Sequence, residues 1–263
     1  MYSKKLQTPI WLFSLSFFLV SCIKDHDLGV PYQVPVISKQ GVALPYSVLD
    51  NLLGVEVRNG GFGSSATAHP YNPGEFYALT DRGPNADATG GKYFPIPGYT
   101  PRIGHFRLTQ DGKIEKIAEI LIKDPSGKPI SGRPNPAGKG ATGEIPYDLN
   151  DQVLDFDEFG LDTEGLVAMK DGTFWVSDEY GPHMAHLRAD GTQIERISPV
   201  NVNTGTRKLP AVLERRWANR GMEGLTITPD EKTLVGIMQS RLYNPSNAAA
   251  TNRTLTRIIT FDV

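Results

Sequence analysis

Short runs of alternating hydrophobic and polar residues recur along most of the chain, with turn residues between them. Clear examples are residues 102–108 (RIGHFRL) and 257–263 (RIITFDV), and this alternation is typical of β-strands. Asp-Gly pairs at 111–112 and 190–191 separate such runs and predict β-hairpins. Helical periodicity is confined to a short stretch around 209–219. The pattern therefore predicts an almost entirely β domain.

The strand pattern also repeats. One unit begins in residues 63–84 and contains FYALTDRGP, a second begins in 162–182 and contains FWVSDEYGP, and a third begins in 221–240. Four short strands joined by turns, repeated in this way, describe the blade of a β-propeller. We therefore predict an all-β fold of the β-propeller class. The third unit reaches Val263 without the Asp-Gly turn and outer strand of the other two, which predicts a propeller that is incomplete at the C-terminus.

The N-terminus has the features of an export signal. Two lysines precede an apolar run at residues 10–20, which is too short to span a membrane but long enough for the core of a signal peptide. The run ends in Leu-Val-Ser-Cys, which resembles a bacterial lipobox, and Cys22 is the only cysteine of the chain. We expect Cys22 to be lipidated and to attach the protein to a lipid bilayer.

These features divide the chain into three parts. Residues 1–21 are the predicted lipoprotein signal peptide, 22–44 a tether without sustained periodicity, and 45–263 the propeller domain. The protein is then expected to be a cell-envelope lipoprotein, at the outer membrane or the periplasmic face.

Charge excludes one class of partner. The chain has 27 basic and 29 acidic residues, for a net charge of −2, and its lysines and arginines form no cluster. A nucleic-acid-binding protein carries a basic patch, so we expect no nucleic-acid partner.

Acidic residues recur at equivalent positions of the repeated units. They are Asp81, Asp162, Glu164, Asp178, Glu179 and Glu223. Inner strands of a propeller converge, so these carboxylates should crowd one mouth of the channel and require a cation. Oxygen ligands without a thiolate favour Ca²⁺ or Mg²⁺ over zinc or copper. We predict a Ca²⁺ site; an alternative is that these acids accept hydrogen bonds from turn amides.

Four stretches together resemble the phytase-like family that is described by an esterase-like activity of phytase. They are LTDRGPN (79–85), DTEGL (162–166), VSDEYGP (176–182) and NRGMEGL (219–225), and the resemblance extends over about 46–263. It implies a propeller and a hydrolase of phosphoester or other ester bonds, with a small-molecule ester or phosphoester as substrate.

The expected mechanism is metal-assisted hydrolysis. The predicted ligands of Ca²⁺ are Asp81, Glu164, Asp178 and Glu223, and the predicted catalytic residues are Glu179, Arg82, His183 and Arg220. A carboxylate such as Glu179 would orient water, and the two arginines would pair with phosphate oxygens or, alternatively, with neighbouring acids. His183 is a candidate acid or base, and Ser177 a candidate nucleophile without an identified base.

A second hypothesis belongs to another class of protein. The same chain could be a non-catalytic propeller that binds a ligand or partner at the cell envelope, because one fold supports both kinds of function. Acidic side chains that converge on a bindable cation would favour the hydrolase, whereas an apolar or aromatic mouth would favour the binding module.

Overall fold

The computed structural model describes residues 33–35, 41–202, 204–246 and 255–263. The predicted signal peptide and Cys22 lie outside the described residues, as does most of the predicted tether. Residues Val34–Val263 form one compact unit, and the elements below belong to it. Within the described residues, no helix is long and apolar enough to cross a membrane.

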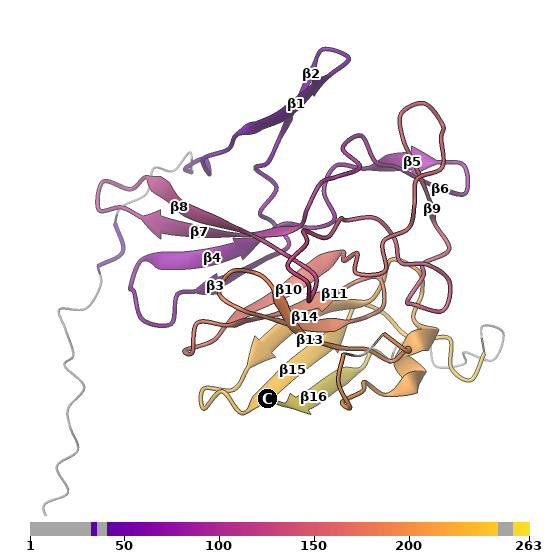
Figure 1. Ribbon diagram of the computed structural model, residues 1–263. Coiled ribbons are helices and arrows are strands. Elements are labelled where there is room, and N and C mark those ends of the chain that lie inside the picture. The colour runs from indigo at the N-terminus through magenta and orange to yellow at the C-terminus, as the bar shows by residue number, and fades with distance from the viewer. Residues whose placement is uncertain (1–32, 36–40, 203, 247–254) are drawn as a thin grey trace, which may run out of the picture. The chain divides into compact units, whose positions relative to one another are not determined.

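Three antiparallel sheets make up most of the structure (Figure 1). The first contains β3 (Ser65–Ala68), β4 (Glu75–Leu79), β7 (Arg102–Leu108) and β8 (Ile114–Leu121), in that order. The second contains β10 (Thr163–Ala168), β11 (Phe174–Asp178), β12 (Met184–Leu187) and β13 (Gln193–Ile197). The third contains β14 (Met222–Ile227), β15 (Thr233–Met238) and β16 (Ile258–Asp262).

The all-β prediction is confirmed, and the repeated runs form the predicted strands. The Asp-Gly hairpins also form. Gly112 has a φ of 76° and Gly191 a φ of 83°, the left-handed region that glycine enters without steric cost. No sheet closes on itself among the described residues, so the closed ring of a propeller stays a prediction.

Two hydrophobic cores separate the three sheets. Leu79 and Ile103 of the first sheet pack with Leu166, Phe174 and Val176 of the second. On the opposite face of the second sheet, Val167, Trp175 and Met184 pack with Met222 and Leu234 of the third sheet. All five residues of β11 are buried because the second sheet is covered on both faces. Alternate side chains of one strand therefore enter different cores.

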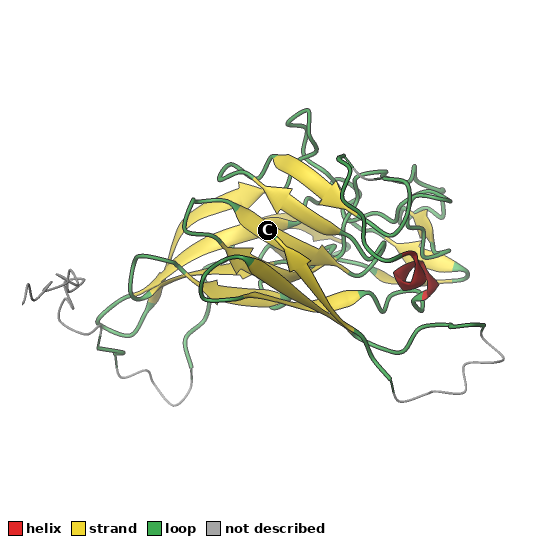
Figure 2. Cartoon of the chain, turned by 90° about the horizontal axis from the view of Figure 1, so that it is seen from below, coloured by secondary structure: helices red, strands yellow, loops and turns green. Residues whose placement is uncertain are grey.

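Smaller elements decorate this stack. They are the hairpin of β1 (Val48–Leu52) and β2 (Val55–Arg58), the sheet of β5 (Ala86–Ala88), β6 (Gly91–Tyr93) and β9 (Ile145–Tyr147), and the 3₁₀ helix η1 (Ala211–Arg215). The alternation pattern did not predict these short strands. Strand β9 pairs in parallel with β6, so the long segment 124–150 contains a strand. Loops and η1 gather at one end of the sheets, as Figure 2 shows.

Candidate functional site

Two equivalent glutamates lie at β-bulges near the start of their strands. In the second sheet Thr163 pairs with Asp178 and Gly165 with Ser177, which leaves Glu164 without a register partner. In the third sheet the same shift between Met222 and Gly224 leaves out Glu223. A bulge redirects the side chain of the extra residue and is frequent beside active sites. The repeated Glu-Gly-Leu motif therefore carries its carboxylate on a bulge in both sheets.

The glycine after Glu164 lets the second and third sheets approach closely. A Cβ atom on Gly165 would lie 2.5 Å from Leu225 Cβ and 2.3 Å from Ser177 Oγ. Such distances are far below van der Waals contact, so only glycine fits without a shift of the backbone. The two glutamates therefore lie on β10 and β14, which approach each other closely at Gly165.

Three carboxylates meet at this end of the second sheet. Asp162, Glu164 and Glu179 each offer an oxygen, and these oxygens lie within 4.8 Å of one another. Burial raises the pKa of Glu164 to about 8, and the charges of Asp162 and Glu223 add to the increase. Burial and the Glu223 charge raise the pKa of Glu179 to about 7. The cluster therefore holds more negative charge than its surroundings compensate, and a cation or a proton would relieve it.

Glu223 completes the cluster from the third sheet. Its Oε1 atom is buried and has no hydrogen-bond partner among the described residues. Burial raises the pKa of Glu223, and a hydrogen bond between its carboxyl group and that of Glu179 opposes the increase. A buried oxygen without a donor is costly unless a ligand or water supplies one. We refer to Asp162, Glu164, Glu179 and Glu223 as the carboxylate cluster.

Arg82 is the buried cation beside the cluster. Its Nε lies 3.3 Å from Asp162 Oδ2, and its backbone N–H donates to Asp162 Oδ1 at 3.1 Å. Its Nη1 faces Glu144 Oε2 at 3.3 Å and Asn219 Oδ1 at 3.0 Å. One arginine thus links the first repeated unit to the second and to the segment that leads into β14, which begins three residues after Asn219.

The two predicted metal-ligand aspartates accept backbone hydrogen bonds instead of facing the cluster freely. Asp178 Oδ1 accepts from the N–H of Asp162 at 2.8 Å, and its Oδ2 accepts from those of Gly181 and His183 at 2.6 and 3.3 Å. Asp81 Oδ1 accepts from the N–H of Gly83 at 2.8 Å. For these two residues the geometry matches the turn-amide alternative. Both shape the loops that present Asp162, Glu179 and Arg82.

His183 is fully buried and engaged on both ring nitrogens. Nδ1 lies 2.8 Å from Ser198 Oγ, and Nε2 lies 3.2 Å from Asn135 Oδ1. The Asn135 amide donates to the carbonyls of Asp157 and Gly160, which fixes its oxygen toward the histidine. Nε2 therefore carries the proton. Burial lowers the pKa of His183 far below its ordinary value, and the Arg196 charge adds to this, so the ring stays neutral.

Two further predicted residues, Arg220 and Ser177, are not placed to act at the cluster. Arg220 is exposed, and its guanidinium lies 5.6 Å from the centre of the Trp217 ring. Ser177 is fully buried, and its Oγ has no hydrogen-bond partner among the described residues. The Oγ faces the Gly165 backbone, and Leu225 of the third sheet packs at the same place. A substrate could reach Ser177 only if the third sheet moved away.

The sequence pattern missed four residues of the site: Glu144, Tyr180, Arg216 and Asn219. The Tyr180 hydroxyl donates to the carbonyl of Gly132 at 2.6 Å. The Arg216 guanidinium donates to the carbonyls of Gly140 and Ala141 at 2.8 and 3.1 Å. Tyr180 and Asn219 stand inside quoted motifs, which is a usable signal. Glu144 and Arg216 occupy irregular segments with no repeat partner, so the repeat gave no indication of them.

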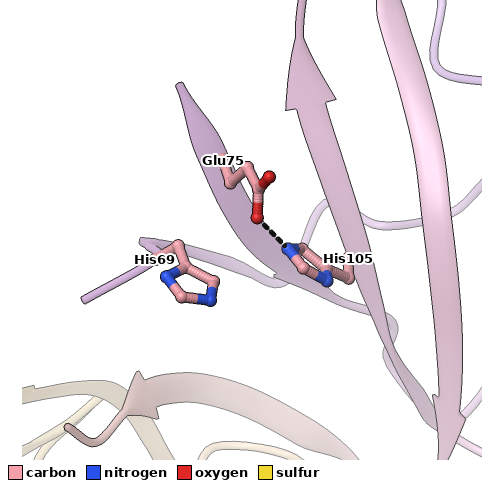
Figure 3. A group of neighbouring side chains, drawn as sticks. All are labelled: His69, Glu75 and His105. Carbon is pink, nitrogen blue, oxygen red and sulfur yellow. Dashed lines mark hydrogen bonds and ion pairs between the residues drawn. The ribbon is translucent and has the colours of Figure 1, made fainter. Parts of the chain in front are cut away.

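A second group of potential metal ligands lies on the first sheet, and Figure 3 shows it. Oxygen and nitrogen atoms of His69, Glu75 and His105 lie within 4.8 Å of one another. Here every ligand atom of the carboxylate is occupied, because Arg107 donates twice to Glu75 Oε1 while Asn72 and His105 contact Oε2. His69 Nδ1 accepts from the backbone N–H groups of Tyr71 and Asn72 at 3.1 Å each, so its Nε2 carries a proton. We refer to His69, Glu75 and His105 as the histidine group.

A larger hollow, of about 450 Å³, lies among residues 97–100, 124–133 and 155–159. Three of its acids already have partners: Asp157 accepts from Ser131 and Phe159, Asp124 accepts from turn amides, and Glu158 pairs with Lys139. The carboxylate cluster has the unsatisfied chemistry that this hollow lacks, so we place the candidate site at the cluster.

Comparisons with known proteins identify the family. The chain is 28% identical over 257 residues to an uncharacterized secreted protein of Arthroderma benhamiae, covering 78% of this chain and 49% of that protein. A solved luciferin-regenerating enzyme aligns with a TM-score of 0.32 and 15% identity, covering 74% of this chain and 59% of that one. The chain thus spans about half the length of the curated relative that it matches. The model of the phytase-like family, described as esterase-like activity of phytase, matches residues 57–263, and the chain belongs to this family.

Proposed function

We propose that this protein is a hydrolase of ester bonds, phosphoesters among them, and that it works with a divalent cation at the carboxylate cluster. One observation carries the proposal: Asp162, Glu164 and Glu179 bring three oxygens within 4.8 Å of one another, beside the unpaired oxygen of Glu223. Membership of a family described by an esterase-like activity supports the reaction class.

The residues present fit a calcium ion. All donors are carboxylate oxygens, which Ca²⁺ prefers, and the buried Oε1 of Glu223 is an acceptor without a donor. Asp162, Glu164 and Glu179 would hold the ion, with Glu223 next to them. This set differs from the sequence-based set because it follows the three carboxylates whose oxygens lie within 4.8 Å of one another, and that group does not include Asp81 or Asp178. A cation bound there would polarise the ester or phosphate oxygen and stabilise the negative charge of the transition state.

The chain's own residues supply the remaining functions. Arg82 holds Asp162 in place through its Nε and backbone N–H, and its guanidinium is the buried cation nearest to where an anionic group would approach. Asp178 fixes the turn that carries Glu179 and Tyr180. Glu179 and Glu223 contact each other, so one carboxyl group of this pair can retain a proton while the other accepts one from water.

The experiment is hydrolysis of 4-nitrophenyl acetate and 4-nitrophenyl phosphate by the purified chain, with Ca²⁺ added after EDTA treatment. We expect Ca²⁺-dependent release of 4-nitrophenol, and a large loss in Glu164→Gln because this change removes one ligand charge at nearly constant shape. Glu115→Gln is the matched control, since Glu115 is exposed on β8. Equal activity in Glu164→Gln and in the control would contradict the assignment of the site.

The binding-module hypothesis gives a different result in the same experiment. Calcium would then bind and stabilise the protein, but neither ester would be hydrolysed by the wild-type chain. Hydrolysis that does not depend on calcium would support the hydrolase function and contradict the role of the cation.

We further propose that the protein is exported and anchored in the cell envelope through lipidated Cys22. The apolar run before Cys22 supports this, as does the relative of Arthroderma benhamiae, which is described as secreted. Mass spectrometry of membrane-extracted protein should find a modified N-terminal Cys22, and Cys22→Ser should be released in soluble form. Release of the wild-type protein to the same extent would contradict the anchor.

The propeller is also part of the proposal. The three stacked sheets, each with its first strand at the inner edge, have the order and pairing that successive blades require. The cores between the first and second and between the second and third sheets correspond to the contacts between neighbouring blades.

A further inference from the structure

One nitrogen of the Arg82 guanidinium, Nη1, is near more hydrogen-bond acceptors than it has hydrogens. Nη1 lies 3.0 Å from Asn219 Oδ1, 3.3 Å from Glu144 Oε2 and 3.5 Å from the Tyr180 hydroxyl oxygen. An Nη atom carries two hydrogens, so the three acceptors cannot all receive a full hydrogen bond. One of the contacts is therefore weak and replaceable.

Glu144 is the replaceable partner. The Glu144 side chain is 19% exposed, against 3% for the other carboxylate partner of Arg82, Asp162. Asp162 also accepts from the backbone of Arg82, and the Tyr180 hydroxyl is held by the Gly132 carbonyl. Solvent thus reaches Arg82 most readily from the side of Glu144.

The chain around Glu144 has the freedom to leave. Gly138, Gly140 and Gly143 have φ values of 76°, 105° and 87°, so this segment is rich in glycines in the left-handed region. Polar contacts hold it in place: Arg216 binds the carbonyls of Gly140 and Ala141, the Thr142 hydroxyl donates to Glu144 Oε2 at 3.1 Å, and Lys139 Nζ pairs with Glu158 Oε1 at 3.0 Å. The position of Glu144 thus depends on a few polar contacts of a segment without regular structure.

We propose that Glu144 occupies the place of the substrate's own anionic group, so that the site prefers esters with a phosphate or carboxylate group, which displaces Glu144 and binds Arg82. This names a substrate class and a self-inhibiting contact for the proposed hydrolase. Binding of the anion to Arg82 does not depend on the proposed function, whereas hydrolysis of the bound ester rests on it. Arg82 recognises oxyanions bidentately, which a carboxylate held at 3.3 Å on one nitrogen does not exploit.

The test measures phosphate binding, without turnover. Inorganic phosphate is titrated into the full chain in EDTA at constant ionic strength, and the shift of the melting temperature gives an apparent Kd. Because an internal competitor lowers the fraction of binding-competent protein, we expect Glu144→Gln to tighten the apparent Kd roughly fivefold or more. Glu144→Asp keeps the charge but shortens the side chain, and it should tighten binding as well.

Two comparisons separate this effect from a general change of charge. Glu115→Gln removes the same charge from a residue that is exposed on β8, and it should leave the Kd unchanged. Adding Arg82→Lys to Glu144→Gln should abolish the gain, because lysine cannot bind an oxyanion bidentately. Unchanged phosphate affinity in both Glu144 variants, or an equal gain in Glu115→Gln, overturns the proposal.

A parallel assay separates this inference from the proposed function. If wild type and Glu144→Gln hydrolyse esters, the ratio of kcat/KM for 4-nitrophenyl phosphate over 4-nitrophenyl acetate should rise in the variant. Tighter phosphate binding with no hydrolysis of either ester would keep the Arg82 subsite and refute the hydrolase. Hydrolysis with an unchanged ratio and an unchanged Kd would support the hydrolase and refute the Arg82 subsite.

Discussion

The carboxylate cluster and the histidine group each place the ligand atoms of three residues within 4.8 Å of one another, Asp162, Glu164 and Glu179 in the cluster, but they differ in how those atoms are satisfied. In the histidine group, Arg107, Asn72 and His105 saturate Glu75, and the hydrogen bond from Asn72, followed by those from Arg107, lowers the pKa of Glu75 to about 2. In the carboxylate cluster, burial and like charges raise the pKa of Glu164 to about 8. Proximity of ligand atoms is therefore a weaker indication of a metal site than their unsatisfied hydrogen bonds.

The arginine of each group should show the largest contrast. Arg82→Met leaves Asp162 buried without its cation, and we expect a loss of about 3–5 kcal/mol in the free energy of unfolding. Arg107→Met should cost far less, because the Arg107 side chain is 50% exposed and solvent replaces much of its contact. Urea unfolding of both variants measures the two values, and equal losses would contradict the contrast.

Calcium should act on one group alone. Binding to the folded state stabilises it by about 2.7 kcal/mol when free Ca²⁺ is at 100 times its Kd. We expect Ca²⁺ to raise the melting temperature of the wild type and EDTA to reverse the rise. Glu164→Gln and Glu223→Gln should reduce the response, whereas Glu75→Gln should keep it. An unchanged response in the double variant Glu164→Gln/Glu223→Gln would remove the cation from the cluster.

The contrast also shows where sequence reasoning succeeded. Alternation and Asp-Gly turns predicted the strands of the three sheets because these strands pack on hydrophobic cores and several are joined by short hairpins. The same periodicity could not reveal β5, β6 and β9, whose three residues each are too short to show an alternation. Their pairing depends on loops that are distant in sequence.

Site residues followed the same rule. Glu164 and Glu223 were found because the bulge repeats with the strand, and Glu179 because it follows a repeated motif. The repeat could not show that Asp178 turns both oxygens to backbone amides, since this depends on the path of a loop. Nor could it place Glu144, which reaches Arg82 across 62 residues of sequence. Loop geometry and long-range contacts thus set the limits of the prediction.

The pH dependence of stability should also differ between the carboxylate cluster and the histidine group. The pKa of Glu164 is raised to about 8 in the folded state, against about 4.5 when unfolded. The folded chain then retains a proton that the unfolded chain loses, so the stability of the metal-free protein should fall as the pH rises from about 4.5 to 8. Glu164→Gln should flatten this part of the curve and raise the melting temperature at pH 8. Melting temperatures of wild type and variant in EDTA from pH 4 to 9 test this, with Glu115→Gln as the control.

Glu75 should show the opposite sign and the smallest effect. Its folded pKa is lowered to about 2, so its contribution is fully present above the unfolded value of about 4.5 and is lost as the pH falls toward 2. Glu75→Gln should therefore lower the melting temperature at pH 7 by only a few degrees, because Arg107 is half exposed and screened by solvent. The difference between wild type and variant should shrink below pH 4. A difference that instead grows toward low pH would show that Glu75 is not held as a carboxylate, and the histidine group would then be open to another ligand.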